Sequence, residues 1–145
     1  QGMQVTKINF ANGKKSTKFL WLSDDFSQIR WAKAKIRKGY SKVEVSDVRD
    51  MSFGPLSNSF QKALKFQDVP FNECLSLYHS NRTLDLLIPD ARIKTWLMGL
   101  QWLLFSQKRL STPVVSESQF IFKKVALKLK HEAFLSRTPL TKYLV

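Results

Sequence analysis

The chain has few of the residues that usually mark catalytic or metal centres. It has one cysteine, Cys74, and two histidines, His79 and His131, among 145 residues. One thiol cannot form an internal disulfide or a thiol-only zinc site, and Cys74 lies in an apolar segment typical of a buried side chain. The histidines lie in different segments, with no metal-ligand spacing or Ser-His-Asp arrangement nearby. We therefore expect no catalytic residues, no metal site, no cofactor and no enzymatic activity.

Long apolar runs and acidic residues are also scarce. No stretch reaches the roughly 18 apolar residues that a membrane-spanning helix requires, and the first ten residues are too polar for a secretory signal. Asp and Glu number 11 against 24 Lys and Arg, so the net charge is +13. It is +8 over residues 1–42, −1 over 43–105 and +6 over 106–145. Two basic ends around a neutral middle favour a phosphate-rich partner, which is either a membrane surface or a nucleic acid.

Seven short segments have the composition and alternation of β-strands. Turn signals between them include Asn12-Gly13, Gly54-Pro55 and the Ser80-Asn81 step. Residues 56–72 break the pattern and are expected to hold a short helix inside a loop. The predicted strands lie within residues 3–10, 17–25, 26–35, 42–48, 49–55, 73–79 and 82–88.

The segment after the last strand predicts an amphipathic helix over about residues 91–107. Asp90 is its expected N-cap. Because glycine costs about 1 kcal/mol in a helix, Gly99 is expected to allow close approach of another element, with a neutral choice as the alternative. The helix would close one end of the curled sheet, with burial of Trp96 contributing several kcal/mol. The predicted fold is mostly β, a seven-stranded antiparallel, partly open barrel capped by this helix. The apolar stripe comprises Ile93, Trp96, Leu97, Leu100, Leu103 and Leu104.

Residues 108–145 are expected to form a linker and a basic amphipathic extension that follows a domain over residues 3–107. Ser116 or Ser118 could cap a helix over residues 119–135, although alternation in 125–130 leaves a strand open. The helix either contacts a membrane or a partner protein, or docks on the flank of the domain, which we prefer. Its predicted apolar stripe is Phe122, Val125, Ala126, Leu129 and Ala133, and the lysines away from it are Lys123, Lys124, Lys128 and Lys130.

Three segments resemble a pleckstrin homology domain, most closely the type found in phospholipase C of the delta class. They are KFLWLSDDFSQIRW at 18–31, VEVSDVRDMSFGPLSNSFQ at 43–61 and NRTLDLLIPDARIKTWLMGLQWLL at 81–104. The third segment is the most specific, with a Thr-Leu-Asp-Leu strand, then a helix with Trp96, Gly99 and Leu100 in the family's spacing. The resemblance covers about residues 4–106 and implies a seven-stranded barrel with a capping helix.

The resemblance also implies that the open end of the barrel, opposite the helix, recognises an anionic phospholipid headgroup. Ser16-Thr17-Lys18 stands where tight phosphoinositide binders of the family have two basic residues, and a lysine gives a point charge rather than a bidentate fork. Phosphoinositide and phosphatidic acid therefore both stay open as ligands. The lipid-binding residues that the resemblance implies are Lys7, Lys14, Lys15, Lys18, Lys33, Lys35 and Arg37.

The residues alone favour the same partner, since Lys14 and Lys15 at a hairpin tip place two cations together and each cation near an anionic membrane contributes about 1 kcal/mol. We expect a peripheral protein on the cytosolic face of a membrane. The alternative is a protein-interaction scaffold of the same fold without a specific lipid, with a protein partner at the C-terminal helix. Nucleic acid is disfavoured, because the aromatic residues that could stack on bases lie on predicted strands.

Overall fold

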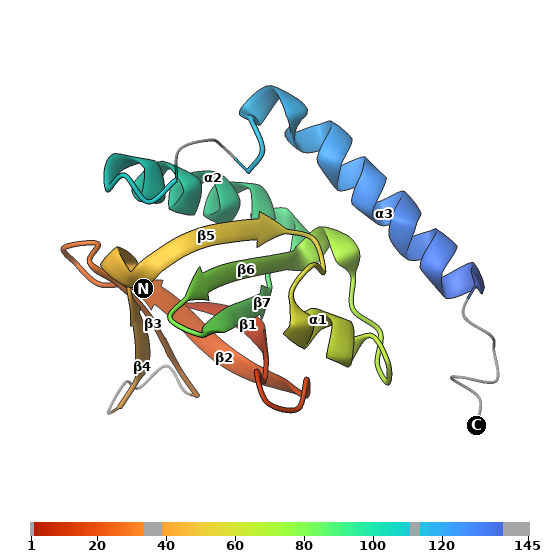
Figure 1. Ribbon diagram of the computed structural model, residues 1–145, viewed down its shortest axis with the longest axis horizontal. Coiled ribbons are helices and arrows are strands. Elements are labelled where there is room, and N and C mark those ends of the chain that lie inside the picture. Colours follow the sequence, from red (N-terminus) through yellow and green to blue (C-terminus); the bar gives the residue numbers. More distant parts are fainter. Residues whose placement is uncertain (1, 34–38, 111–113, 138–145) are drawn as a thin grey trace.

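The structure, a computed structural model, describes residues 2–33, 39–110 and 114–137 (Figure 1). Seven strands come first along the chain, interrupted by one short helix, and two longer helices follow them. The strands are β1 (Met3–Ile8), β2 (Lys15–Leu22), β3 (Gln28–Ala32), β4 (Ser41–Glu44), β5 (Val48–Phe53), β6 (Cys74–His79) and β7 (Arg82–Leu87). The helices are α1 (Asn58–Ala63), α2 (Asp90–Ser106) and α3 (Phe120–Arg137), with 3-10 turns η1 (Val45–Asp47), η2 (Phe71–Glu73) and η3 (Glu117–Gln119).

All seven strands form one antiparallel sheet in the order β4-β3-β2-β1-β7-β6-β5. β4 and β5 are consecutive in the chain but lie at opposite edges of the sheet, so the sheet must curl for η1 to join them. The predicted strand over 42–48 is therefore two elements, since η1 turns the chain there and the Val45 amide donates to the Ser27 carbonyl at 2.8 Å. The predicted seven-stranded, partly open barrel with a capping helix is confirmed.

The inner face of the barrel follows from the pairing register. Residues paired across antiparallel strands point to the same face, and successive residues along one strand point to opposite faces. Leu20 of β2 lies opposite Met3 of β1, and Leu84 of β7 lies opposite Leu77 of β6. Leu20, Leu77 and Leu84 are almost fully buried, so this face holds the core.

Helix α2 closes one end of the barrel with a buried row formed by Ile93, Leu97, Leu100 and Leu104. Trp96 is only partly buried, so the expected contribution of several kcal/mol from this side chain was too large. None of the helices in the described residues is both long enough and apolar enough to cross a bilayer.

Two sequence expectations for α2 were wrong. Pro89, not Asp90, is the N-cap, and the Asp90 carboxylate instead accepts hydrogen bonds from Asn72 at 2.9 Å and Lys124 at 3.0 Å. Tertiary partners at both oxygens thus replace the local capping bond. A Cβ added at Gly99 would meet no atom within 4 Å, so this glycine lies at open space rather than at a close approach.

Helix α1 covers the outer face of β1 and β7, as the short helix predicted within residues 56–72. Ser57 caps it by accepting from the Phe60 amide at 3.2 Å, and donates to the Asp85 carboxylate at 2.5 Å. Ser76 and Thr83 also donate to Asp85. Three hydroxyl donors make this fully buried carboxylate tolerable beneath the helix.

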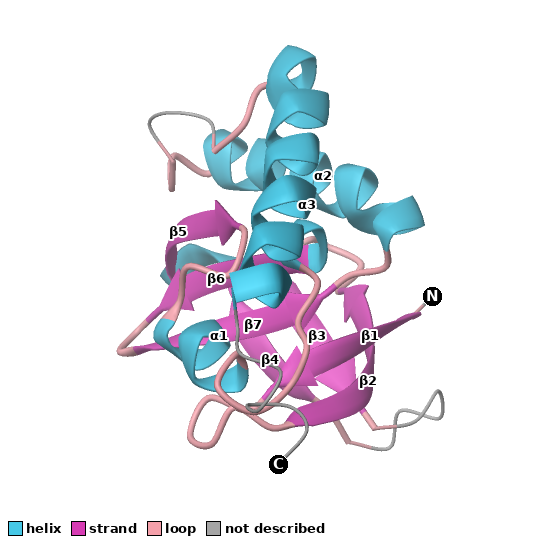
Figure 2. Cartoon of the chain, turned by 90° about the vertical axis from the view of Figure 1, so that its right-hand side faces the viewer, coloured by secondary structure: helices cyan, strands magenta, loops and turns pink. Residues whose placement is uncertain are grey.

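Helix α3 docks along the outer flank of the barrel through a face that the sequence did not indicate (Figure 2). Phe120 stacks on Phe53 with ring centroids 5.7 Å apart, and the buried Leu127 lies over Gly54. The predicted stripe faces solvent instead, because the aromatic and glycine partners on the barrel select the Phe120 and Leu127 side. The stripe residues with large exposed side chains are Phe122, Val125 and Leu129.

The linker before α3 is tied to α2. The amide group of Gln101 accepts from the backbone amides of Val114 and Val115 and donates to the Val115 carbonyl at 2.8 Å. Val115, Phe120 and Leu127 join the same hydrophobic cluster as the barrel core. The expected boundary at residue 107 remains a prediction, although the packing on its two sides is continuous.

Candidate functional site

Lysines of three strands gather at the end of the barrel opposite α2. Lys18 lies opposite Val5 and shares the inner face with the buried Leu20, so it points into the barrel two residues nearer the hairpin. Lys7 shares this face with Val5 on the neighbouring strand. Lys33 directly follows the last β2–β3 pair, Phe19–Ala32, and continuing that register places it beside Lys18.

A fourth cation comes from β7. Arg82 lies on the same face as Leu84, and Lys7 pairs with Leu86 two residues further along. Burial lowers the pKa of Lys7, and the positive charges of Arg82 and Lys18 lower it further. Lys7 therefore lies close enough to Arg82 and to Lys18 to be repelled by both. We call Lys7, Lys18, Lys33 and Arg82 the mouth cluster.

Few carboxylates in the described part of the chain lie near enough to the mouth cluster to neutralise its positive charge. Within residues 2–33, 39–110 and 114–137, none of its members forms an ion pair with a carboxylate. The nearby Asp85 offsets the effect on the pKa of Lys7 only in part, and its carboxylate accepts from three hydroxyl groups. Cations held together without counter-charges favour an anion from outside the chain.

A hollow of about 240 Å3 opens beside Arg82. The Arg82 guanidinium lies over the Phe10 ring at 5.0 Å from its centroid, and Arg49 donates to the Ser80 carbonyl from the other side of the β6–β7 turn. Two guanidinium groups and several amide and hydroxyl groups therefore border one hollow, and Arg82 belongs both to this lining and to the cations of the barrel mouth. Its lining includes Phe10, Arg49, Asn58, Asn81, Arg82 and Thr83.

The β1–β2 hairpin separates its two lysines. Lys15 lies opposite Ile8 on the outer face and donates to the Asp68 carbonyl at 2.6 Å, so it points away from the mouth cluster. Lys14 precedes β2 at the rim and is exposed. The other two lipid-binding residues implied by the resemblance, Lys35 and Arg37, lie outside the described residues.

The hairpin loop before Lys14 and Lys15 is fixed by side-chain contacts. The Asn9 side chain accepts from the amides of Ala11 and Asn12, and Gln67 donates to the Gly13 carbonyl. Gly13 has φ +72°, and a Cβ there would lie 3.1 Å from the Ala63 amide nitrogen. The loop therefore packs against α1 with room for glycine alone.

Sequence reasoning missed Arg82 and Arg49 because it sought cations only on the first three strands. A signal was available, since Arg82 directly follows the predicted Ser80-Asn81 turn. A strand that begins there must start at the mouth if it then runs towards a helix plugging the other end. Arg49 gave no comparable signal, because a register shift between Val48 and Asp50 displaces it from simple alternation.

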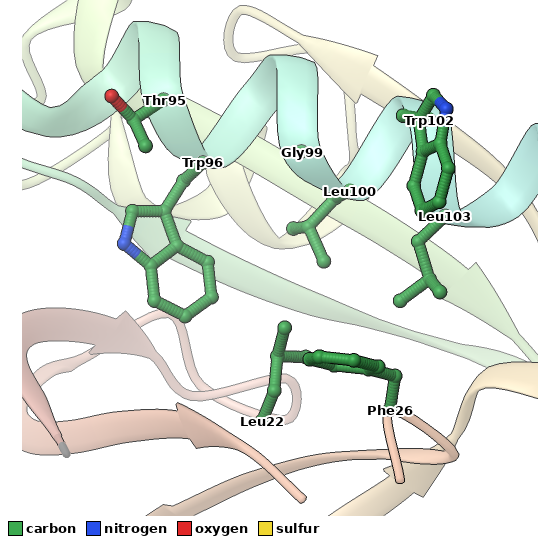
Figure 3. Close-up of a pocket in the computed structure, with 8 residues that line it drawn as sticks. All are labelled: Leu22, Phe26, Thr95, Trp96, Gly99, Leu100, Trp102 and Leu103. Atoms are coloured by element: carbon green, nitrogen blue, oxygen red, sulfur yellow. The ribbon is translucent and has the colours of Figure 1, made fainter. Parts of the chain in front are cut away.

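The plugged end holds a different kind of hollow, of about 260 Å3, between α2 and the β2–β3 turn (Figure 3). Leu22, Phe26 and Leu103 contribute to an almost entirely apolar lining. Gly99 also lines the hollow, where it has no side chain to fill the space. Phe26 has φ +60°, in a turn where the Asp25 carboxylate accepts from Ser27. None of the described residues that line this hollow is a cation, so the hollow does not suit a charged headgroup.

The single cysteine and the two histidines have structural contacts rather than the arrangement of a metal site. Cys74 is buried, which raises the pKa of its thiol well above the usual value, and it donates to the Pro70 carbonyl. His131 pairs with Asp68 at 2.7 Å on the docked face of α3. His79 lies opposite Arg82, and burial together with that positive charge lowers its pKa. Among the described residues, no three His, Cys, Asp or Glu side chains group as metal ligands would.

Comparison with known proteins adds little to this geometry. No family model matches the sequence, and none of the curated proteins matches it. Among solved structures, the chain is similar to the crystal structure of S. officinalis PLC21, at 14% sequence identity and a TM-score of 0.47. The similarity covers 71% of this chain and 16% of that chain. The description of the fold as pleckstrin homology-like therefore rests on the strand order and the capping helix.

Proposed function

We propose that the chain is a peripheral membrane-binding module that recognises a phosphate-bearing lipid headgroup at the mouth cluster. The observation that carries this proposal is the convergence of Lys7, Lys18 and Arg82 without a carboxylate partner among the described residues. The repulsion of Lys7 by Arg82 and Lys18 is relieved when a phosphate binds between them. We propose that the module acts by binding and not by catalysis, on the cytosolic face of a membrane.

The ligand chemistry that fits is a phosphomonoester, which phosphoinositides and phosphatidic acid share. Lysine point charges bind such a group with little directional selectivity, whereas a guanidinium fork favours a second, well-placed phosphate. The hollow bordered by Arg49 and Arg82 offers room for that second phosphate. Tighter binding of a bisphosphorylated inositol lipid than of phosphatidic acid would assign this role to Arg82.

Liposome co-sedimentation with matched variants tests the proposal. The mouth variant carries Lys7→Gln and Lys18→Gln, and the control carries Arg92→Gln and Lys94→Gln on the exposed surface of α2 at the plugged end. Both lose two positive charges. Vesicles should contain either a phosphoinositide or phosphatidic acid at equal surface charge, at fixed ionic strength. We expect the mouth variant to lose binding and the control to keep most of it.

Equal losses in the two variants would mean that net charge, and not a site, attracts the membrane. Binding that survives in the mouth variant would refute the proposed site. If the wild-type protein does not bind either vesicle, the alternative of a protein-interaction scaffold takes its place.

A further inference from the structure

Helix α3 buries one face against the barrel and leaves a more apolar face in solvent. Phe120 and Leu127 are buried, whereas Phe122, Val125 and Leu129 are 77%, 47% and 59% exposed. The three exposed side chains follow each other at i, i+3 and i+7, so they form one continuous stripe over two helical turns. Contiguous exposed apolar side chains of this size mark an interaction surface more often than scattered ones do.

The contacts between α3 and the barrel do not involve this stripe. His131 and Phe134 contact the Phe71 ring at centroid distances of 4.9 and 5.6 Å. Lys124 pairs with Asp90 at 3.0 Å. The barrel therefore fixes which side of α3 faces outward, and the outward stripe is held in a defined orientation.

Cations flank the stripe on both sides. At 100° per residue, Lys128 lies along one border, and Lys130 and Arg137 lie along the other. All three are exposed. Glu132, the single carboxylate of the helix, lies between Lys128 and Val125, so the two borders together carry three cations and one anion. The charge complement of this surface is an apolar groove with an acidic rim.

The stripe lies on the side of α3 that faces away from the barrel, because Phe120 and Leu127 on the other side are buried. Figure 1 shows α3 along one side of the molecule and the β1–β2 hairpin, which borders the mouth, on another, and Figure 2 shows α3 in front of the barrel. The spacing of the stripe and its fixed outward orientation favour a protein groove as the occupant.

We propose that the outward face of α3 docks into the apolar, acid-rimmed groove of a calcium-loaded EF-hand sensor protein. Such a groove takes a basic amphipathic helix by apolar anchors at i, i+3 or i+4, and i+7, which is the spacing of Phe122, Val125 and Leu129. Phe120 and Leu127 keep α3 docked on the barrel, so only its outward face is free to bind. One EF-hand lobe is sufficient to cover that face. This surface would add calcium-dependent recruitment of a partner to a membrane-bound module, and it does not depend on the lipid assignment.

Calmodulin is a suitable probe of this class, and titration calorimetry with calcium or with a calcium chelator is the direct measurement. We expect binding with calcium alone. Phe122→Ser with Leu129→Ser should weaken it by about 30-fold or more, since anchor side chains dominate such interfaces. The matched control, Leu56→Ser with Phe66→Ser, removes two other exposed apolar side chains and should bind as the wild type does. Lys7→Gln with Lys18→Gln should also leave binding unchanged.

Calcium-independent binding, no binding, or equal binding by the Phe122/Leu129 variant would overturn the proposal. Two other occupants have distinct signatures. Dimerisation that disappears in that variant, measured by light scattering, would assign the face to a second copy of the chain. Vesicle binding that disappears in that variant while the mouth cluster is intact would assign it to a membrane. Circular dichroism and thermal unfolding verify that each variant is folded.

Discussion

Replacing Lys7 by Met should weaken lipid binding and at the same time stabilise the fold. The Lys7 ammonium is partly buried beside Arg82 and Lys18, and both charges lower its pKa. A phosphate contact from such a charge contributes about 1.5–3 kcal/mol, so its loss should weaken headgroup binding roughly 10- to 150-fold. Met keeps the apolar stem without the repulsion, and we expect a gain of about 0.5–1 kcal/mol in unfolding free energy.

Lys15→Met is the matched control on the same hairpin. Lys15 points to the outer face and donates to Asp68, so its loss should reduce stability by about 0.5–1.5 kcal/mol. Its removal should weaken membrane binding only by the general charge effect of about 1 kcal/mol. Urea unfolding and vesicle partitioning of both variants measure these opposite changes. A Lys7→Met protein that is less stable than wild type, or that binds lipid as well, would refute the reasoning.

The pH dependence of the Lys7 effect has a defined sign. The folded-state pKa of Lys7 is below its unfolded value of 10.5, so the unfolded chain binds more protons between the two values. The contribution of Lys7 to stability is therefore unfavourable below both values and is relieved as the pH rises through the lowered pKa. The stability difference between Lys7→Met and wild type should shrink over this alkaline range.

The remaining predictions concern other parts of the molecule. The pKa of His79 is below 6.5, so its burial lowers the unfolding free energy as the pH falls. A bound anion should raise that pKa, so lipid binding by the wild type should strengthen on acidification more than binding by a His79→Gln variant. Vesicle partitioning across pH measures this difference. Ser57→Ala removes a helix cap and a donor to the buried Asp85, and should lower the unfolding free energy by about 1–3 kcal/mol in urea titration. Gly54→Ala should destabilise the protein because φ at Gly54 is +113° and the new Cβ lies 3.0 Å from the Leu127 side chain. In a double-mutant cycle, Leu127→Ala should remove this close contact but not the backbone strain.

The barrel was predictable because its information is local. Alternation, the turn at Ser80-Asn81 and the Ile93, Leu97, Leu100 spacing each limit a segment to one structure. Antiparallel strands joined by short turns leave few arrangements for such segments. The helix cap was not predictable in the same way, because Asp90 bonds to Lys124, which lies 34 residues further along the chain.

The candidate site was only partly predictable, because it depends on which face of a strand each cation occupies. Lys14 and Lys15 are adjacent, and a one-residue difference in register decides which of them points to the mouth. The buried face of helix α3 was also difficult to predict from the sequence. Its sequence has apolar residues on both faces, and the partners on the barrel, Phe53 and Gly54, determine which face is buried.

The close packing of Gly13 against Ala63 has a consequence for how a headgroup would be bound. A rim segment that is already ordered loses little conformational entropy when an anion arrives, so association should proceed without a slow rearrangement step. Amide hydrogens in residues 9–14 should exchange slowly even in the absence of lipid. Lengthening the loop by one residue should break the contact with α1 and slow the encounter without removing any cation.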